Sequence, residues 1–135
     1  MKIDNVNYAS GSGSLSFDVT TGTGSISKTL SSTLDMSNHL NQSSLFYYLY
    51  LPLGTALTST EIRWGSSGSA YYSRTLTTTN EGNAFATGWN LIRGDWQGAT
   101  VVGSPNVTKI AYIDVLVTVT SNQTGIKVDL SLIHI

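Results

Sequence analysis

The sequence predicts an all-β domain in which two antiparallel sheets form a jelly-roll sandwich of eight or nine strands, with no significant helix. Three observations lead to this fold class. β-Branched and aromatic residues are plentiful, whereas the strong helix formers Ala, Glu, Lys, Gln and Arg are few. Apolar and polar residues alternate in several segments, which is the period of a strand with one buried face. Gly or Asn interrupts the chain about every ten residues, as turns between strands do.

The first half of the chain predicts three strands. Apolar residues alternate with polar ones over 15–19, and a Thr-Gly-Thr-Gly turn at 21–24 follows. Residues 26–34 then form the second predicted strand. Residues 45–51 are apolar on both faces of an extended chain, which predicts a central or sandwiched strand.

The second half predicts the remaining strands. Residues 60–64 and 71–79 flank a Gly-Ser-Ser-Gly turn and are predicted to form a hairpin. Further strands are expected at 89–96, 110–120 and 125–133, and the last two alternate cleanly between Val, Ile or Leu and other residues. An immunoglobulin-like sandwich is the weaker alternative, because its Cys and Trp markers are absent.

The inward positions of these strands define the predicted core, because every second residue of a strand points to the same face. These positions are Leu15, Phe17, Leu49, Leu51, Ile62, Leu91, Ile113, Val115, Val117, Val128 and Leu130.

Length and composition predict one domain over residues 1–135, either whole or excised from a larger chain. The 135 residues are enough for one core, and no linker or repeat divides them. Only 11% of residues are charged, with seven basic and eight acidic side chains, so no positive field attracts nucleic acid. The chain has no Cys, which excludes disulfides, thiolate nucleophiles and Cys-bound zinc.

Two further absences concern the membrane and secretion. The longest apolar stretch, Leu45–Leu53, is far shorter than the roughly 20 residues of a membrane-spanning helix, so no membrane insertion is expected. The first residues lack a basic region followed by an apolar run, the pattern of a secretory signal. An extracellular location would therefore require another export route or a longer parent chain.

The sequence predicts no enzyme. Its two histidines, His39 and His134, are not spaced to pair with another ligand or nucleophile. The eight carboxylates lie singly along the chain, so a glycosidase pair would have to be assembled by the fold alone. No Gly-rich loop leads into a helix to hold a phosphate, because no helix is expected.

Aromatic residues in the middle of the chain are the candidates for ligand binding. Sugar rings present flat C–H faces that stack on Trp or Tyr, while amide and guanidinium groups bind the hydroxyls. The alternative is that these rings fill the sandwich core, as most aromatics of a small β domain do. The candidate ligand-binding residues are Tyr71, Tyr72, Trp89, Asn90, Arg93 and Trp96.

Asp129 is the candidate metal ligand. It lies in the last predicted strand on the face opposite Val128 and Leu130, where it is either solvated or part of a structural calcium site. In the second case Asp4 or Asn5 and backbone carbonyls would complete the site where the two ends of the chain meet. No other cofactor is expected.

Arg93-Gly94-Asp95 is a tripeptide that integrin ligands display. Tripeptides of this sequence that bind integrins lie at the tips of loops. Here it lies inside the predicted strand 89–96, so we expect no integrin-type adhesion from it.

Several short segments, taken in order, give the sequence a family resemblance. It resembles jelly-roll domains of the galactose-binding-like and carbohydrate-binding type, in particular the variant found in structural proteins of tailed bacteriophages. The resemblance spans nearly the whole chain, and its most specific part is Gly88-Trp89-Asn90 followed by a strand and Trp96. The segments are Tyr8–Asp18, Leu34–Ser37, Leu51–Leu53, Gly88–Leu91, Tyr112–Asp114 and Val128–Leu130.

The resemblance implies a non-enzymatic structural or adhesion module on the tail, fibre, baseplate or head surface of a virion. Other virion chains, further copies of the same chain and a host-surface glycan are the partners that it implies. The alternative is an extracellular carbohydrate-binding module of a secreted glycan-degrading enzyme. Unlike the sugar-binding members, the sequence is expected to carry no row of exposed aromatics along one strand.

Overall fold

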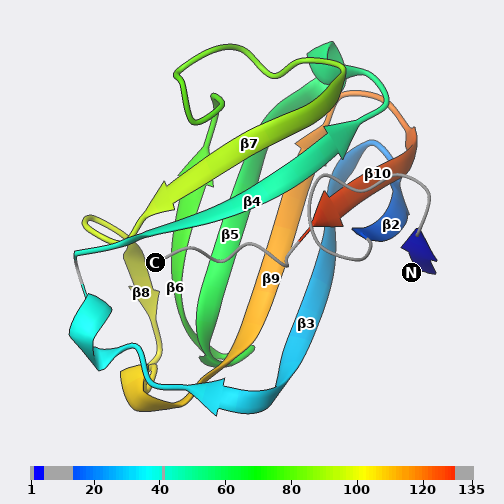
Figure 1. Ribbon diagram of the computed structural model, residues 1–135. Coiled ribbons are helices and arrows are strands. Elements are labelled where there is room, and N and C mark those ends of the chain that lie inside the picture. The colour runs from blue at the N-terminus through cyan, green and yellow to red at the C-terminus, as the bar shows by residue number, and fades with distance from the viewer. Residues whose placement is uncertain (1, 5–13, 41, 130–135) are drawn as a thin grey trace.

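The computed structural model describes residues 2–4, 14–40 and 42–129, which form two antiparallel β-sheets packed face to face (Figure 1). These residues contain no α-helix. Three short 3-10 turns, η1 (Ser37–His39), η2 (Gly54–Ala56) and η3 (Val107–Lys109), lie between strands. The all-β sandwich predicted from the sequence is confirmed.

Each sheet has five strands. The first sheet has the order β1-β2-β10-β4-β7 and consists of β1 (Lys2–Asp4), β2 (Ser14–Val19), β10 (Gln123–Asp129), β4 (Ser44–Leu51) and β7 (Gly88–Asp95). The second has the order β3-β9-β5-β6-β8 and consists of β3 (Gly22–Leu34), β9 (Ile110–Val119), β5 (Leu57–Ser67), β6 (Ala70–Leu76) and β8 (Thr100–Val102).

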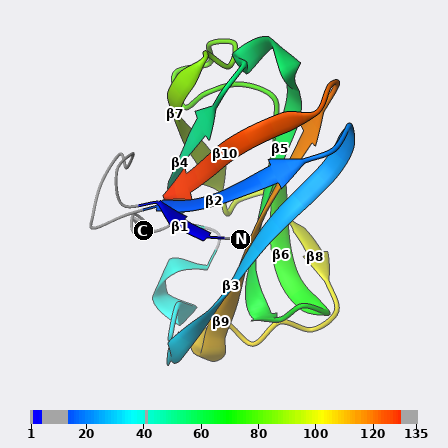
Figure 2. The same cartoon turned by 90° about the vertical axis from the view of Figure 1, so that its right-hand side faces the viewer.

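The strand pairing is nested, as in a jelly roll. β5 pairs with β6, β4 with β7, β3 with β9 and β2 with β10, all antiparallel. The chain therefore forms one long ribbon of paired strands that folds over on itself, with successive pairs falling in alternate sheets. Figure 2 shows β2 and β10 side by side in the first sheet.

The described residues contain ten strands, more than the eight or nine predicted. The two strands that were not predicted, β1 and β8, have three residues each and lie at sheet edges. All three residues of β8 are exposed, so the strand has no apolar alternation that the sequence could display. The predicted hairpin is confirmed as β5 and β6.

The core lies between the sheets and agrees closely with the prediction. Leu15 and Phe17 are only partly buried but pack against it. Leu91 was wrongly assigned to the core, because the register of β7 directs Ile92 inward and Leu91 outward. Leu130 lies outside the described residues. The predicted residues that are buried are Leu49, Leu51, Ile62, Ile113, Val115, Val117 and Val128.

Three aromatic rings pack together in the core near the β6 and β7 edge. The ring centroids of Trp64 and Tyr72 are 5.9 Å apart and nearly parallel, and the Trp64 and Trp96 rings meet edge to face at 5.5 Å. Tyr72 and Trp96 are 5.1 Å apart. Aromatic pairs in such arrangements stabilise a protein beyond the area they bury.

A buried hydroxyl chain crosses the core between the sheets. Thr60 Oγ1 donates to the Leu116 carbonyl at 2.9 Å, so the Tyr47 hydroxyl, also 2.9 Å from Thr60 Oγ1, acts as the donor to Thr60. Tyr47 is fully buried. Burial raises the pKa of the Tyr47 hydroxyl far above its ordinary value, because the phenolate would be desolvated.

Alkaline solution is therefore expected to destabilise the domain. Because the Tyr47 pKa is raised in the folded state, the neutral hydroxyl contributes fully to the free energy of unfolding below the ordinary tyrosine pKa of about 10. This contribution is lost as the pH rises above that value. Each such tyrosine adds a slope of up to about 1.4 kcal/mol per pH unit. Urea unfolding of wild type and Tyr47→Phe between pH 8 and 11 checks this: the variant should lose stability less steeply. If the free energy of unfolding fell equally steeply with pH in wild type and variant, the prediction would be contradicted. Burial also raises the pKa of Tyr72 and Tyr112, so part of the slope should remain in the variant.

Candidate functional site

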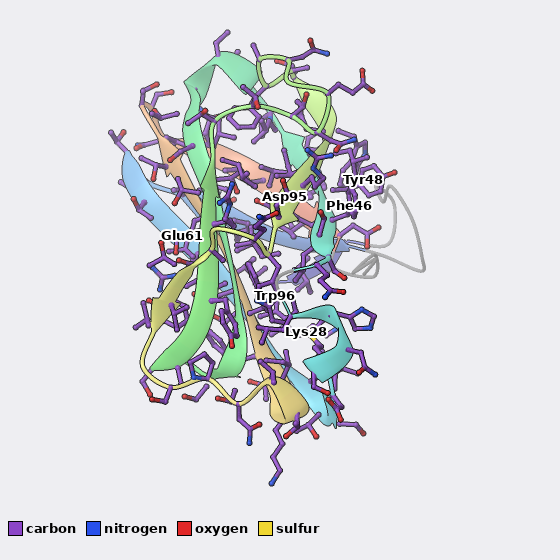
Figure 3. The ribbon with its side chains drawn as sticks, turned by 90° about the vertical axis from the view of Figure 1, so that its left-hand side faces the viewer. Lys28, Phe46, Tyr48, Glu61, Asp95 and Trp96 are labelled. Atoms are coloured by element: carbon purple, nitrogen blue, oxygen red, sulfur yellow. The ribbon has the colours of Figure 1, made fainter. Side chains whose placement is uncertain are left out.

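The candidate ligand-binding residues do not share one surface. Tyr72 and Trp96 belong to the aromatic cluster of the core, with 9% and 0% of their surfaces exposed. Figure 3 shows Trp96 between the two sheets, with Phe46 and Tyr48 on the outer side of β4 and Glu61 on the far side of the other sheet. Because their rings are enclosed by the core, Tyr72 and Trp96 cannot stack on a ligand at the surface.

Tyr71 lies on the outer face of the second sheet. The guanidinium carbon of Arg63 is 4.8 Å from the centroid of the Tyr71 ring, and Arg63 also forms an ion pair with Glu61. The hydrogen bond to Glu61 is the main cause that raises the pKa of Arg63. Tyr71 is thus separated from the remaining candidates by the whole thickness of the sandwich.

Trp89, Asn90 and Arg93 lie together on β7, the edge strand of the first sheet. Trp89 and Arg93 share its outer face, whereas Asn90 points inward and is 3% exposed. Four residues of a strand span about 13 Å, so Arg93 is distant from the Trp89 ring. The Trp89 end of β7 is the part of the predicted site that the fold assembles.

No described strand carries a row of exposed aromatics, as expected, but β4 carries a row of half-buried ones. β4 directs Phe46, Tyr48 and Tyr50 outward at every second residue, each half-buried, beside Trp89 on β7. The Tyr50 and Trp89 rings meet edge to face at 5.4 Å, and Lys127 Nζ lies 4.3 Å from the Tyr50 centroid. Tyr50 is therefore already engaged on two sides and holds the Trp89 ring in place.

The Arg93-Gly94-Asp95 tripeptide lies within β7, as predicted, and not on a loop. Arg93 Nε is 3.2 Å from Asp95 Oδ1, which also accepts a hydrogen bond from Ser44 Oγ. Gly94 is buried, and a Cβ there would lie 2.9 Å from Ile62. Both charged groups are thus engaged within the domain.

A pocket of about 230 Å³ lies between the edge strand β7 and the loop at 77–87. Its lining combines the Trp89 indole and apolar side chains with amide, hydroxyl and carboxylate side chains. The lining residues are Thr79, Asn80, Glu81, Asn83, Ala84, Ala86, Trp89, Asn90 and Leu91.

Backbone hydrogen bonds give the first part of this loop a defined shape. The Thr79 N–H donates to the Asn83 carbonyl at 2.8 Å, and the Gly82 N–H donates to the Thr79 carbonyl at 2.9 Å. The Asn80 N–H donates to the Leu91 carbonyl at 2.8 Å and so ties the loop to the free edge of β7. This part of the loop is therefore held against β7, the strand that carries Trp89.

The buried side chain of Asn90 fixes the second part of the loop. Its Oδ1 accepts from the Ala86 N–H at 2.8 Å, and its Nδ2 lies within donor distance of the carbonyls of Ala86 (2.9 Å) and Gly88 (3.0 Å). Gly54 lies against the same segment, where a Cβ would come within 2.4 Å of the Ala86 carbonyl carbon. Asn90 is a positioning residue for the loop segment at Ala86 that lines the pocket.

One lining residue, Asn80, carries an unsatisfied hydrogen-bonding atom. Asn80 Oδ1 is enclosed by the protein and has no hydrogen-bond partner in the described part of the chain. A buried acceptor without a donor is destabilising. Nothing in the sequence singles out Asn80, Glu81 and Asn83 as pocket residues, because Asn-Glu-Gly-Asn is typical of a turn.

Asp129 is fully buried at the end of β10, whose neighbours are β2 and β4. β2 separates β10 from β1, so the backbones of Asp129 and Asp4 are about 10 Å apart at a strand spacing of about 4.8 Å. Asn5 lies outside the described residues. Among the residues that are described, no three His, Asp or Glu side chains form a group that could hold a metal ion. The calcium site stays a prediction.

Comparisons with known proteins leave the family open. A scan against protein-family models found no match, and a search of curated proteins found none either. Within the described ranges, no helix has the length and apolar character needed to cross a bilayer.

Proposed function

We propose that this domain is a non-enzymatic adhesion module that binds a saccharide in the pocket beside Trp89. The observation that carries the proposal is the pocket itself, whose lining combines a half-buried indole with amide, hydroxyl and carboxylate side chains. Such a combination fits a sugar, because one face of the ring is apolar and its rim carries hydroxyls.

The chemistry of the lining favours binding over catalysis. Glycoside hydrolysis canonically needs two carboxyl groups on either side of the scissile bond. Glu81 is the one carboxylate among the lining residues, and no histidine or basic side chain accompanies it there. We therefore assign the pocket to recognition.

The sequence resemblance favours a bacteriophage particle as the setting, with the module on a tail, fibre, baseplate or head surface. The rival is a carbohydrate-binding module of a secreted glycan-degrading enzyme. Light scattering distinguishes them, because a virion module is expected to form symmetric oligomers or to bind other virion chains, whereas a detached module is expected to be a monomer.

Replacing Trp89 with Ala is expected to weaken saccharide binding at least tenfold, because a stacked ring contributes roughly 1 to 2 kcal/mol. A glycan array identifies the ligand, and calorimetric titration of wild type and variant measures the change. Tyr71→Ala is the matched control: it removes a half-buried ring from the opposite face and should leave the affinity unchanged. Binding that is lost in Tyr71→Ala but kept in Trp89→Ala would contradict this site.

A further inference from the structure

We propose that the pocket beside Trp89 prefers a sugar that carries a protonated amino group, such as a 2-amino-2-deoxyhexose, to the corresponding neutral and acidic sugars. This inference rests on the proposed saccharide function and names the chemical class of the ligand. The charge of the lining carries it, because one carboxylate and one indole line the pocket and no basic side chain lies among the lining residues.

The size of the pocket limits the ligand to about one sugar residue. Its volume of about 230 Å³ is below the roughly 300 to 1,000 Å³ of sites that enclose drug-sized ligands. A single substituent on one ring is therefore a large part of what the site can recognise.

The carboxylate of Glu81 is available to a ligand. Glu81 belongs to the lining of the pocket and is exposed. Within the described part of the chain it forms neither a hydrogen bond nor an ion pair, whereas Glu61 and Asp95 are each paired with an arginine. A cation that enters the pocket therefore meets a carboxylate that no protein group has neutralised.

The loop holds Glu81 beside the strand that carries the indole. The N–H of the preceding residue, Asn80, donates to the Leu91 carbonyl of β7 at 2.8 Å. Leu91 and Trp89 point to the same face of β7, two residues apart. The carboxylate and the indole are therefore presented to one ligand by backbone segments that are fixed to each other.

No cation offsets the charge of Glu81 inside the pocket. Arg93 and Lys127, on the outer face of the first sheet, are engaged elsewhere. Arg93 Nε is 3.2 Å from Asp95 Oδ1. Lys127 Nζ lies 4.3 Å from the centroid of the Tyr50 ring, on β10, and β4 separates β10 from β7. A sugar carboxylate would therefore be repelled by Glu81, whereas an ammonium group would be attracted.

The Trp89 indole favours the same kind of substituent. The face of an aromatic ring attracts an ammonium group, and Trp does so more strongly than Tyr or Phe. The ring is half-buried, and its edge-to-face contact with Tyr50 at 5.4 Å holds it in place. A plain hexose carries a hydroxyl where the amino sugar carries its ammonium group, so charge is the property that separates the two ligands.

The test titrates the whole domain at low salt and pH 6, where the amine of the ligand is protonated, and follows binding by NMR. The probes are the methyl glycosides of glucosamine, galactosamine, N-acetylglucosamine, glucose, galactose and glucuronic acid. At least one amino glycoside should bind about five or more times as tightly as its plain counterpart. The acetamido glycoside, whose nitrogen is uncharged, should show no such gain, and the glucuronide should bind more weakly than the glucoside. High salt should reduce the preference, because it screens exposed charges.

A charge-removing variant tests the role of the carboxylate. Glu81→Gln keeps the shape of the side chain, and its preference for the amino glycoside should fall below about twofold, the part that the indole supplies. Glu61→Gln is the matched control: it removes the same charge from the outer face of the second sheet, away from the pocket, and should leave all six affinities unchanged. Amide spectra verify that each variant is folded. A preference that is the same in wild type and Glu81→Gln overturns the proposal.

Two results separate the inference from the function on which it rests. Equal affinity for amino and plain glycosides, lost in Trp89→Ala, overturns the amino preference and leaves the saccharide site standing. Binding of the acetamido glycoside or the glucuronide that is as tight as that of the amino glycoside overturns the preference as well. Failure of all six glycosides to bind overturns the proposed saccharide function itself.

Discussion

Replacing Trp96 with Ala is expected to lower the free energy of unfolding by about 3 to 5 kcal/mol. The side chain is fully buried and contacts the rings of Trp64 and Tyr72, so the substitution leaves a large cavity and removes two aromatic contacts. For a domain of this size the melting temperature should fall by roughly 10 to 20 °C. Thermal unfolding followed by circular dichroism measures the change.

Trp89→Ala is the matched comparison, since it removes the same side chain from a half-buried position. It loses mainly the edge-to-face contact with Tyr50 and should cost about 1 kcal/mol. If Trp96→Phe is needed to obtain folded protein, it should lie between the two. Similar melting temperatures for Trp96→Ala and Trp89→Ala would show that Trp96 is not part of the core.

Replacing Asn90 with Leu is expected to cost about 2 to 4 kcal/mol and to abolish ligand binding. Leu has a similar shape but leaves the Ala86 N–H and the carbonyls of Ala86 and Gly88 without their partner. The loop would then lose its fixed position relative to Trp89. Urea unfolding gives the stability change, and titration with the ligand found on the array gives the binding change.

Asn122→Leu serves as the control for Asn90→Leu. Asn122 also accepts two hydrogen bonds, from the N–H and the hydroxyl of Thr21, but it is exposed and water can replace it. Its loss should cost less than about 1 kcal/mol. An Asn90→Leu variant as stable as Asn122→Leu, with binding intact, would contradict the positioning role of Asn90.

The sequence predicted the strands wherever one face is apolar and the other polar. On β9 and β10, inward residues alternate with outward ones; the inward residues include Val115, Val117, Ile126 and Val128. Both the two-residue repeat and the identity of the buried face could therefore be predicted. The short edge strand β8 gave no such signal, because all its residues are exposed. Its pairing with β6 is a tertiary effect that no local pattern encodes.

β7 shows why the core assignment of Leu91 failed. The inward positions of this strand hold Gly88, Asn90, Ile92 and Gly94, while Trp89 and Leu91 point outward. The apolar pattern is thus inverted relative to the fold, and reading it by the usual rule puts Leu91 in the core. The failure falls on the strand that lines the pocket.

Only the β7 side of the pocket could be predicted from the sequence. Trp89 and Asn90 were identified because of their chemistry, but the opposite wall comes from a loop whose position depends on the tie between Asn80 and Leu91. Tyr72 and Trp96 were grouped with them only because they are near in sequence. Tyr72 lies inside the sandwich because its register opposite Trp64 turns it inward, and Trp96 lies there because it directly follows β7, where its N–H donates to the Ser43 carbonyl.

The nested strand pairing determines at what point during synthesis on the ribosome the domain can fold. β2 is synthesised early, but it pairs with β10, which is synthesised much later. In the same way, β3 can pair with β9 only after β9 has been synthesised. Among the described strands, the pairs β1–β2 and β5–β6 join strands that are consecutive along the chain. Folding can therefore be completed only after β10 has been synthesised. Until then β2 and β3 have unpaired edges, which chaperones or neighbouring copies of the chain can contact.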